Sequence, residues 1–209
     1  MAKNEQEVRL RGTDILGKKV LILGETGSGK TKLAAKLFKE LTMLLDPEQI
    51  TVIDLAPQRV GKIGGKITDY VNVGGKANYL SPETAYTPRL SGKSPDQVLH
   101  LARLNRERME PLLNRFIQDP TEALVINDIT LYLHLGKLET VLKCVRLANT
   151  FLGTAYYGSK LAEDLGTGIS VKEKQRTDKL AASMDLTVKI DDQETNNRRQ
   201  LRGSRERAS

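Results

Sequence analysis

A glycine-rich stretch near the N-terminus contains the residues best suited to chemistry. It reads GETGSGKT over residues 24–31 and fits the pattern GxxxxGK(S/T) without departure. Glycine permits backbone conformations that a β-carbon resists, so successive N–H groups of such a turn can face inward onto a phosphate. Lys30 can then reach the outer phosphates as a point charge, and Thr31 can offer its hydroxyl to Mg²⁺. The spacing therefore predicts a site for a phosphorylated ligand and a divalent cation.

The sequence on either side of this turn predicts a strand and a helix that hold it in place. The apolar run within 18–23 is typical of a strand buried on both faces, as in a parallel sheet. After the turn, leucines recur every three to four residues, which indicates an amphipathic helix that ends at Asp46-Pro47. The first turn of this helix would add unpaired N–H groups and the positive end of its dipole to the phosphate site.

In this strand–loop–helix setting the chain resembles the P-loop NTPase superfamily over about thirty residues. The resemblance implies a bound nucleoside triphosphate with Mg²⁺. ATP is favoured over GTP because the sequence has no Asn-Lys-x-Asp motif for reading guanine. The residues expected to bind the nucleotide are Gly24, Glu25, Thr26, Gly27, Ser28, Gly29, Lys30, Thr31 and Lys32.

A second apolar run, at 123–126, precedes Asn127 and Asp128 and looks like a Walker B strand. In that motif an acid at the end of the strand holds Mg²⁺ through water, so we expect Thr31 and Asp128 to hold the metal. Many P-loop ATPases place a glutamate directly after this acid, whereas Ile129 follows here. Either another acid polarises the attacking water, or hydrolysis is not the main reaction.

Asp54 is the candidate for that other acid. It lies in a predicted strand over 51–55. Ligands of open α/β sheets bind beyond the carboxyl ends of the strands, so we expect Asp54 near the phosphates. An ordinary polar residue at the end of a strand is the alternative. The predicted catalytic residues are therefore Lys30, Asp54 and Asp128.

Segment 56–93 is a long connection in which no helix is evident, with the glycine-containing sequences VGKIGGKI and NVGGKA. Connections of this length are often lids or binding segments, although a structurally plain insertion is equally compatible with the composition. Lys62, Lys66 and Arg89 are candidates for contacting a substrate or acting in a lid. Short strands at 70–73 and 79–80 could form a small hairpin within it.

The remaining sequence predicts three further helices and two further strands. Pro95 after Ser94, with Gln97 placed for a capping box, starts a helix that ends near residue 118. Ser170 and Glu173 form a similar start for the last helix. The other elements are a helix with an apolar stripe over 138–148, a strand over 150–157 and a strand over 186–190.

Three side chains of the strand at 150–157 are candidate sensors of a γ-phosphate, with ordinary strand packing as the alternative: Thr154, Tyr156 and Tyr157. His100 and His134 have no partner evident in the sequence, and we assign them no chemistry.

The composition indicates a soluble globular protein. Of the 209 residues, 39% are hydrophobic and 28% charged, and the length suits one α/β domain. No apolar run approaches the roughly 20 residues of a membrane span, and the first residues lack the apolar core of a secretory signal. Cys144 is the single cysteine, so an internal disulfide and a Cys/His zinc site are excluded. A cytoplasmic location is expected.

The net charge of +7 is uneven along the chain. Residues 193–209 contain five arginines and two glutamates and show no periodicity, so we expect a disordered basic tail. Such a tail allows contact with nucleic acid without requiring it. A flexible lead-in over 1–12 and one P-loop NTPase domain over 13–192 complete the predicted organisation, and a homo-oligomer is compatible with it.

These elements predict a three-layer α/β/α sandwich with a mainly parallel five-stranded sheet and an insertion at 56–93. The favoured function is Mg²⁺-dependent binding and hydrolysis of a nucleoside triphosphate, coupled to movement of that insertion. One alternative is a P-loop kinase that transfers the γ-phosphate to a small molecule or nucleotide. Another is a nucleotide-gated module that contacts nucleic acid or a partner protein. The order of the strands would separate a RecA-like sheet from a kinase-like one.

Overall fold

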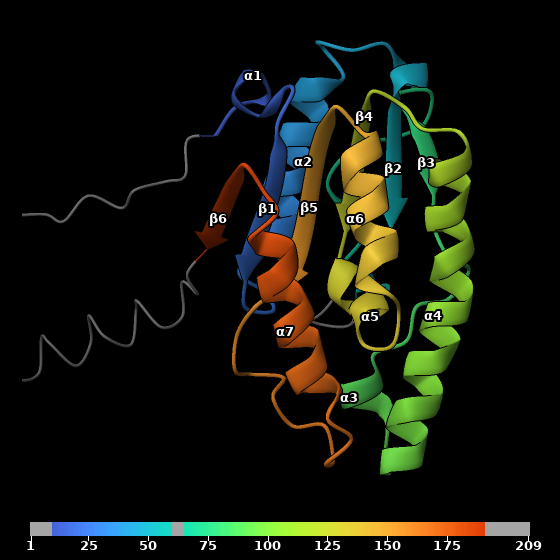
Figure 1. Ribbon diagram of the computed structural model, residues 1–209. Coiled ribbons are helices and arrows are strands. Elements are labelled where there is room, and N and C mark those ends of the chain that lie inside the picture. The colour runs from blue at the N-terminus through green and yellow to red at the C-terminus, as the bar shows by residue number, and fades with distance from the viewer. Residues whose placement is uncertain (1–9, 60–64, 191–209) are drawn as a thin grey trace, which may run out of the picture.

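The computed structural model describes residues 10–59 and 65–190. Its centre is a six-stranded sheet with the order β3-β2-β4-β5-β1-β6, in which the paired strands are parallel (Figure 1). The strands are β1 (Lys19–Gly24), β2 (Ile50–Asp54), β3 (Asn78–Leu80), β4 (Ala123–Asn127), β5 (Thr150–Tyr156) and β6 (Leu186–Ile190). Strands β2, β4 and β5 are buried along their whole length because helices cover both faces of the sheet.

Helices form the two outer layers. They are α1 (Gly12–Ile15), α2 (Lys30–Leu41), α3 (Pro88–Ser91), α4 (Pro95–Gln118), α5 (Ile129–Leu133), α6 (Leu138–Leu147) and α7 (Ile169–Ala181), with short 3-10 turns at Pro47–Gln49 and Ile67–Asp69. On one face, Phe38 of α2 packs in a cluster with Val20 and Val125 of the sheet. On the other face, Phe116 of α4 and Val141 of α6 pack in a cluster with Leu124 and others. The predicted three-layer sandwich is confirmed (Figure 1).

The predicted number of five strands is wrong by one, and the sixth strand comes from segment 56–93. Residues 78–80 form β3, which pairs in parallel with β2, so that Tyr79 lies opposite Val52. Residues 70–73 are not a strand, and the proposed hairpin is absent from the described part of the segment. An isolated two-stranded hairpin would be only marginally stable. Residues 78–80 instead pair with the open edge of β2, which supplies hydrogen-bond partners from the central sheet.

Strand β5 lies between β1 and β4. It therefore separates the strand before the glycine-rich turn from the strand before Asp128, which is the RecA-like order. The carboxyl ends of β1, β5 and β4 reach the same edge of the sheet because the three strands are parallel. This edge collects the turn at 24–31, Thr154 and Asp128 in one place.

The structure confirms one of the two predicted helix starts. Pro95 opens α4, and the Ser94 hydroxyl accepts a bond from the Gln97 backbone N–H at 3.3 Å. The predicted capping box is only half formed, because the Gln97 side chain accepts from the Lys93 N–H at 2.8 Å and not from that of Ser94. In contrast, α7 begins after Gly168, which is in the left-handed region with φ 73°, and the side chain of Asp164 accepts the bond from the Ser170 N–H at 2.9 Å. The capping box predicted from Ser170 and Glu173 is wrong because that carboxylate turns into the core.

Several predictions concern residues outside the described part of the chain. These include Lys62, the basic tail at 193–209 and most of the lead-in at 1–12. In the described residues, no helix has the length and apolar character needed to cross a membrane.

The short helix α5 begins directly after Asp128 and is held by the ring of Tyr132. This side chain is fully buried, and its hydroxyl donates to Glu110 of α4 at 3.3 Å. Gly136 packs on the same ring so closely that a β-carbon there would lie 2.4 Å from the nearest ring carbon. The glycine thereby allows the chain to fold back over the tyrosine.

We expect the substitution Gly136→Ala to lower the free energy of unfolding by about 1–3 kcal/mol, because the added methyl overpacks a buried ring. Gly74→Ala is the matched control, since a β-carbon there meets only the tip of Asn72 at 3.3 Å. Urea denaturation measures both variants. Equal stability of the two would show that the Tyr132 ring yields without cost.

Candidate functional site

The turn at 24–31 is folded as a cradle between β1 and α2. Gly27 and Gly29 have φ angles of 75° and 95°, which L-residues rarely adopt, and Gly29 is the N-cap of α2. The Lys30 ammonium donates to the carbonyl oxygens of Gly24 at 2.9 Å and Glu25 at 2.6 Å. Burial lowers the pKa of Lys30, while Asp128 and Glu25 act in the opposite direction. The ammonium is therefore held over the turn by acceptors that a phosphate can replace.

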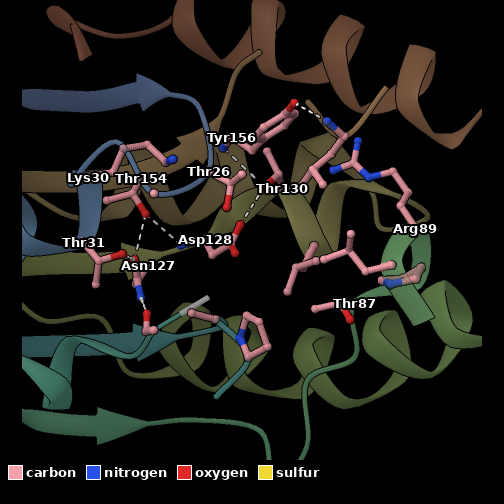
Figure 2. Close-up of a pocket in the computed structure, with 18 of the residues that line it drawn as sticks. Thr26, Lys30, Thr31, Thr87, Arg89, Asn127, Asp128, Thr130, Thr154 and Tyr156 are labelled. Atoms are coloured by element: carbon pink, nitrogen blue, oxygen red, sulfur yellow. Dashed lines mark hydrogen bonds between the residues drawn. The ribbon is translucent and has the colours of Figure 1, made fainter. Parts of the chain in front are cut away.

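A pocket opens beside this cradle. Thr26, Gly27, Lys30 and Thr31 line one side of it. Figure 2 shows Arg89 on the opposite side, with Asp128 and Thr130 between. Among the described residues that line the pocket, Asp128 is the only one with an acidic side chain.

Asn127 lines the pocket and connects four parts of the chain in its wall. Its Oδ1 accepts from the hydroxyls of Thr31 at 3.2 Å and Thr154 at 2.9 Å. Its Nδ2 donates to Asp54 Oδ1 at 2.9 Å and to the Gly65 carbonyl at 3.2 Å. The side chain is fully buried and uses its whole hydrogen-bonding capacity. Thr31 thus meets Asn127, whereas the sequence pattern had suggested Asp128 as its neighbour.

Asp128 lies one residue beyond the end of β4 and faces the pocket (Figure 2). Its backbone is in the left-handed region, with φ 59°, and its N–H donates to the Thr154 hydroxyl at 2.8 Å. Its carboxylate accepts from the Thr130 hydroxyl at 2.7 Å. Burial raises the pKa of Asp128, whereas the bond from Thr130 and the charge of Lys30 lower it.

Asp54 is fully buried and does not line the pocket. Its Oδ2 accepts from the Ile67 N–H at 2.8 Å and from the Tyr79 hydroxyl at 3.1 Å. Its other oxygen holds the Asn127 amide. From this position Asp54 can act on the pocket only through Asn127, whose amide orientation it fixes.

Arg89 reaches the pocket from α3, but most of its contacts lie with α7. Its guanidinium pairs with Glu173 at 2.8 Å, and the same carboxylate oxygen lies 2.5 Å from His134 Nε2. The guanidinium also lies over the Tyr156 ring, 5.1 Å from its centroid. Lys66 turns away from the pocket and donates to the Ser81 hydroxyl at 2.6 Å.

The remaining predicted residues of the turn have different surroundings. Lys32 is exposed on α2 and does not line the pocket. The Ser28 hydroxyl is buried without a partner in the described residues. Glu25 accepts from the backbone N–H groups of Ser159 and Lys160, the latter at 3.0 Å, so it ties the turn to the loop after β5.

Sequence reasoning missed Asn127, Thr130, His134 and Glu173. A signal existed for Glu173, since Ile169, Glu173, Thr177 and Leu180 are the buried residues of α7 and follow helical spacing. A charged residue within such a stripe indicates a buried ion pair. For Asn127, the signal was its place as the last polar residue of an otherwise apolar strand.

The oxygen atoms at the cradle fit a Mg²⁺ ion that is shared with phosphates. The Thr31 hydroxyl gives its proton to Asn127, so its lone pairs remain free to face a cation. The described residues contain no cluster of three or more His, Cys, Asp or Glu side chains able to hold a metal. Mg²⁺ commonly binds through one or two protein ligands together with substrate phosphates and water, which suits this arrangement.

The Tyr79–Asp54 contact predicts a pH dependence. Burial, and then the Asp54 charge, raise the pKa of Tyr79 from 10.0 to about 12. The protonated phenol therefore stabilises the folded chain below pH 10, and this contribution is lost as the pH rises toward about 12. We expect the stability difference between wild type and Tyr79→Phe to shrink over this interval in urea denaturation. A constant difference would show that the phenol titrates normally.

No curated protein matches the sequence. Similar solved structures include an ATPase from the type III secretion system of pathogenic bacteria (14% identity, TM-score 0.42, 83% of this chain and 51% of that one). The flagellar accessory protein FlaH from Methanocaldococcus jannaschii is 14% identical (TM-score 0.39, 75% and 68%). Pif1 helicase from Candida albicans is also 14% identical (TM-score 0.39, 92% and 40%).

Likeness at this level says nothing about function, and the chain spans about half the length of the first of these proteins. The family comparison extends over nearly the whole sequence. A model described as "Helicase HerA, central domain" matches residues 1–201. The P-loop resemblance of the turn at 24–31 is thereby confirmed, and the chain belongs to the family of the HerA helicase central domain.

Proposed function

We propose that the protein binds a nucleoside triphosphate, with ATP favoured, and hydrolyses it with the help of Mg²⁺. The observation that carries this proposal is one pocket in which the cradle residues Lys30 and Thr31 face Asp128. Membership of the HerA family supports nucleotide binding and hydrolysis in general. The insertion of β5 between β1 and β4 favours a hydrolase over a kinase, because it gives the RecA-like strand order.

The cradle provides the grip on the phosphates. The turn amides and the N-terminus of α2 supply N–H donors and a positive dipole end, which favour an anion. Lys30 would exchange its bonds to the carbonyls of Gly24 and Glu25 for bonds to the β- and γ-phosphates. A bond from the ammonium to an anionic phosphate oxygen joins two opposite charges and is stronger than a bond from the same ammonium to a neutral carbonyl, which favours the exchange.

Thr31 is the proposed protein ligand of Mg²⁺. Asn127 holds the Thr31 hydroxyl in place, and Asp54 fixes the orientation of the Asn127 amide. When bound, Mg²⁺ would neutralise charge that develops on the phosphate oxygens. Asp128 would reach the metal through water or, as we favour, act on the attacking water.

Asp128 has the surroundings of a group that orients water and accepts its proton. It lies in the pocket, accepts a bond from Thr130 and leaves its other carboxylate oxygen for a water molecule. Its pKa is raised by burial, which makes it a better proton acceptor than a solvated aspartate. As the water oxygen bonds to the γ-phosphorus, the bond to the bridging oxygen breaks and ADP departs.

The insertion at 56–93 would respond to the nucleotide. Pro57, Gly65 and residues 87–90 at the start of α3 line the pocket opposite the cradle. A change at the phosphates therefore reaches this segment directly, and we propose that hydrolysis is coupled to its movement. The word helicase in the family description makes nucleic acid the polymer to test in the coupled process.

The substitution Lys30→Ala should weaken ATP binding by at least about tenfold, because a charged hydrogen bond to phosphate is lost. Lys36→Ala is the matched control on the exposed side of α2. Isothermal titration calorimetry measures both affinities. Unchanged affinity in Lys30→Ala would refute nucleotide binding at the cradle.

For Asp128→Asn, turnover at saturating Mg²⁺ and ATP should fall by about 10²–10⁴-fold, the usual contribution of a general base. The Mg²⁺ concentration for half-maximal rate should stay constant. Phosphate release is measured without polymer, with DNA and with RNA. A shifted Mg²⁺ requirement with unchanged maximal rate would assign Asp128 to the metal instead.

A further inference from the structure

A buried cluster of Arg89, Glu173 and His134 lies at the far end of the pocket from the cradle. The side chains of Arg89 and Glu173 are 6% and 4% exposed, and that of His134 is fully buried. The three residues come from α3, from α7 and from the residue after α5. The Glu173 carboxylate therefore has two partners, Arg89 at 2.8 Å and His134 at 2.5 Å.

The cluster shares its cavity with the residues proposed to act on the phosphates. Arg89, His134 and Tyr156 all line the pocket. Among the described residues that line the pocket, the lysine and arginine side chains are those of Lys30 and Arg89. Figure 2 places these two side chains on opposite sides of Asp128. A triphosphate that extends from the cradle toward Asp128 would thus have its last phosphate directed at the Arg89 side.

We propose that Arg89 binds the terminal phosphate and makes this site distinguish nucleoside triphosphates from diphosphates. The planar guanidinium can form two parallel bonds to phosphate oxygens, which a lysine ammonium cannot. The inference rests on the proposed function, since it requires a nucleotide in the cradle. It assigns Arg89 to the ligand itself, whereas a purely structural ion pair would only join α3 to α7.

The second partner of Glu173 is what allows Arg89 to change its contacts. Removal of one member of a buried ion pair normally leaves an uncompensated charge at high cost. Here a His134 imidazole with its proton on Nε2 can keep a hydrogen bond to the same carboxylate oxygen when the guanidinium turns away, which lowers that cost. The other Arg89 contacts are long, at 3.4 Å to Ser170 Oγ and to Glu173 Oε1. Stacking on Tyr156 can keep the guanidinium plane in the pocket while its bonds are exchanged.

Arg89→Gln tests the proposal, because glutamine keeps much of the length and some hydrogen bonding but lacks the charge. Calorimetry is performed with the Mg²⁺ complexes of ADP and of the non-hydrolysable triphosphate AMPPNP. The affinity for AMPPNP should fall by about tenfold or more, and that for ADP by less than about twofold. Equal weakening of both nucleotides, or no change for AMPPNP, would overturn the proposal.

Arg59→Gln is the matched control. Arg59 belongs to the same segment, pairs with Asp69 at 3.6 Å and lies over the Tyr70 ring at 5.0 Å, but does not line the pocket. For the Arg59→Gln variant, the ratio of the AMPPNP affinity to the ADP affinity should equal that of the wild-type protein.

Glu173→Gln gives a second, independent measurement, which also serves if Arg89→Gln does not fold. A neutral amide holds the guanidinium less strongly, so the preference for AMPPNP over ADP should exceed that of wild type. An unchanged or reduced preference would show that Arg89 acts only as a structural partner of Glu173. Lys30→Ala separates the two proposals: unchanged binding of both nucleotides refutes the cradle, whereas loss of both leaves the Arg89 result to decide the inference.

Discussion

The buried amide of Asn127 is the contact on which the geometry of the site depends. It joins Thr31 of α2, Thr154 of β5, Asp54 of β2 and the Gly65 carbonyl from its own place at the end of β4. A buried amide with every donor and acceptor used tolerates no rotation, because a flip would oppose two oxygens on one side and leave protons facing hydroxyls on the other. The carboxyl edge of the sheet is therefore fixed by one side chain.

Asn127 and Asp128, the two polar residues that follow the apolar run at 123–126, therefore have different roles. Both residues line the pocket, but the Asn127 amide is occupied by hydrogen bonds within the protein, one of which positions the Thr31 hydroxyl, whereas Asp128 presents its carboxylate to the pocket. The negative charge behind the site is held by Asp54, one strand further along the sheet. It is enclosed by the Ile67 N–H, the Tyr79 hydroxyl and the Asn127 amide.

The sequence predicted the cradle, the parallel sandwich and five of its six strands because these features follow from local patterns. The GxxxxGK(S/T) spacing and the apolar runs need no knowledge of distant contacts. A short strand at 79–80 was expected, but as part of a hairpin with 70–73; residues 78–80 instead join the sheet beside β2, and no local pattern in the sequence reveals that pairing. The cluster of Arg89, Glu173 and His134 also escaped prediction, since it joins residues 39 and 84 positions apart that meet only after α3, α5 and α7 pack. Asp128 was expected beside Thr31, but the residue that contacts the Thr31 hydroxyl is Asn127, one position earlier. The sequence does not show this difference, because it depends on β4 ending at Asn127.

The left-handed backbone at Asp128 limits which acid can occupy this position. With φ and ψ both at 59°, the residue adopts a conformation that aspartate, asparagine and glycine accept far more readily than longer side chains. Glutamate would carry its carboxylate further into the pocket and would be forced into an unfavourable main-chain geometry. The shape of the chain at the end of β4 therefore selects the shorter acid before any requirement of chemistry is considered. A relative whose strand ended one residue later, with an ordinary backbone there, would be free to use the longer one.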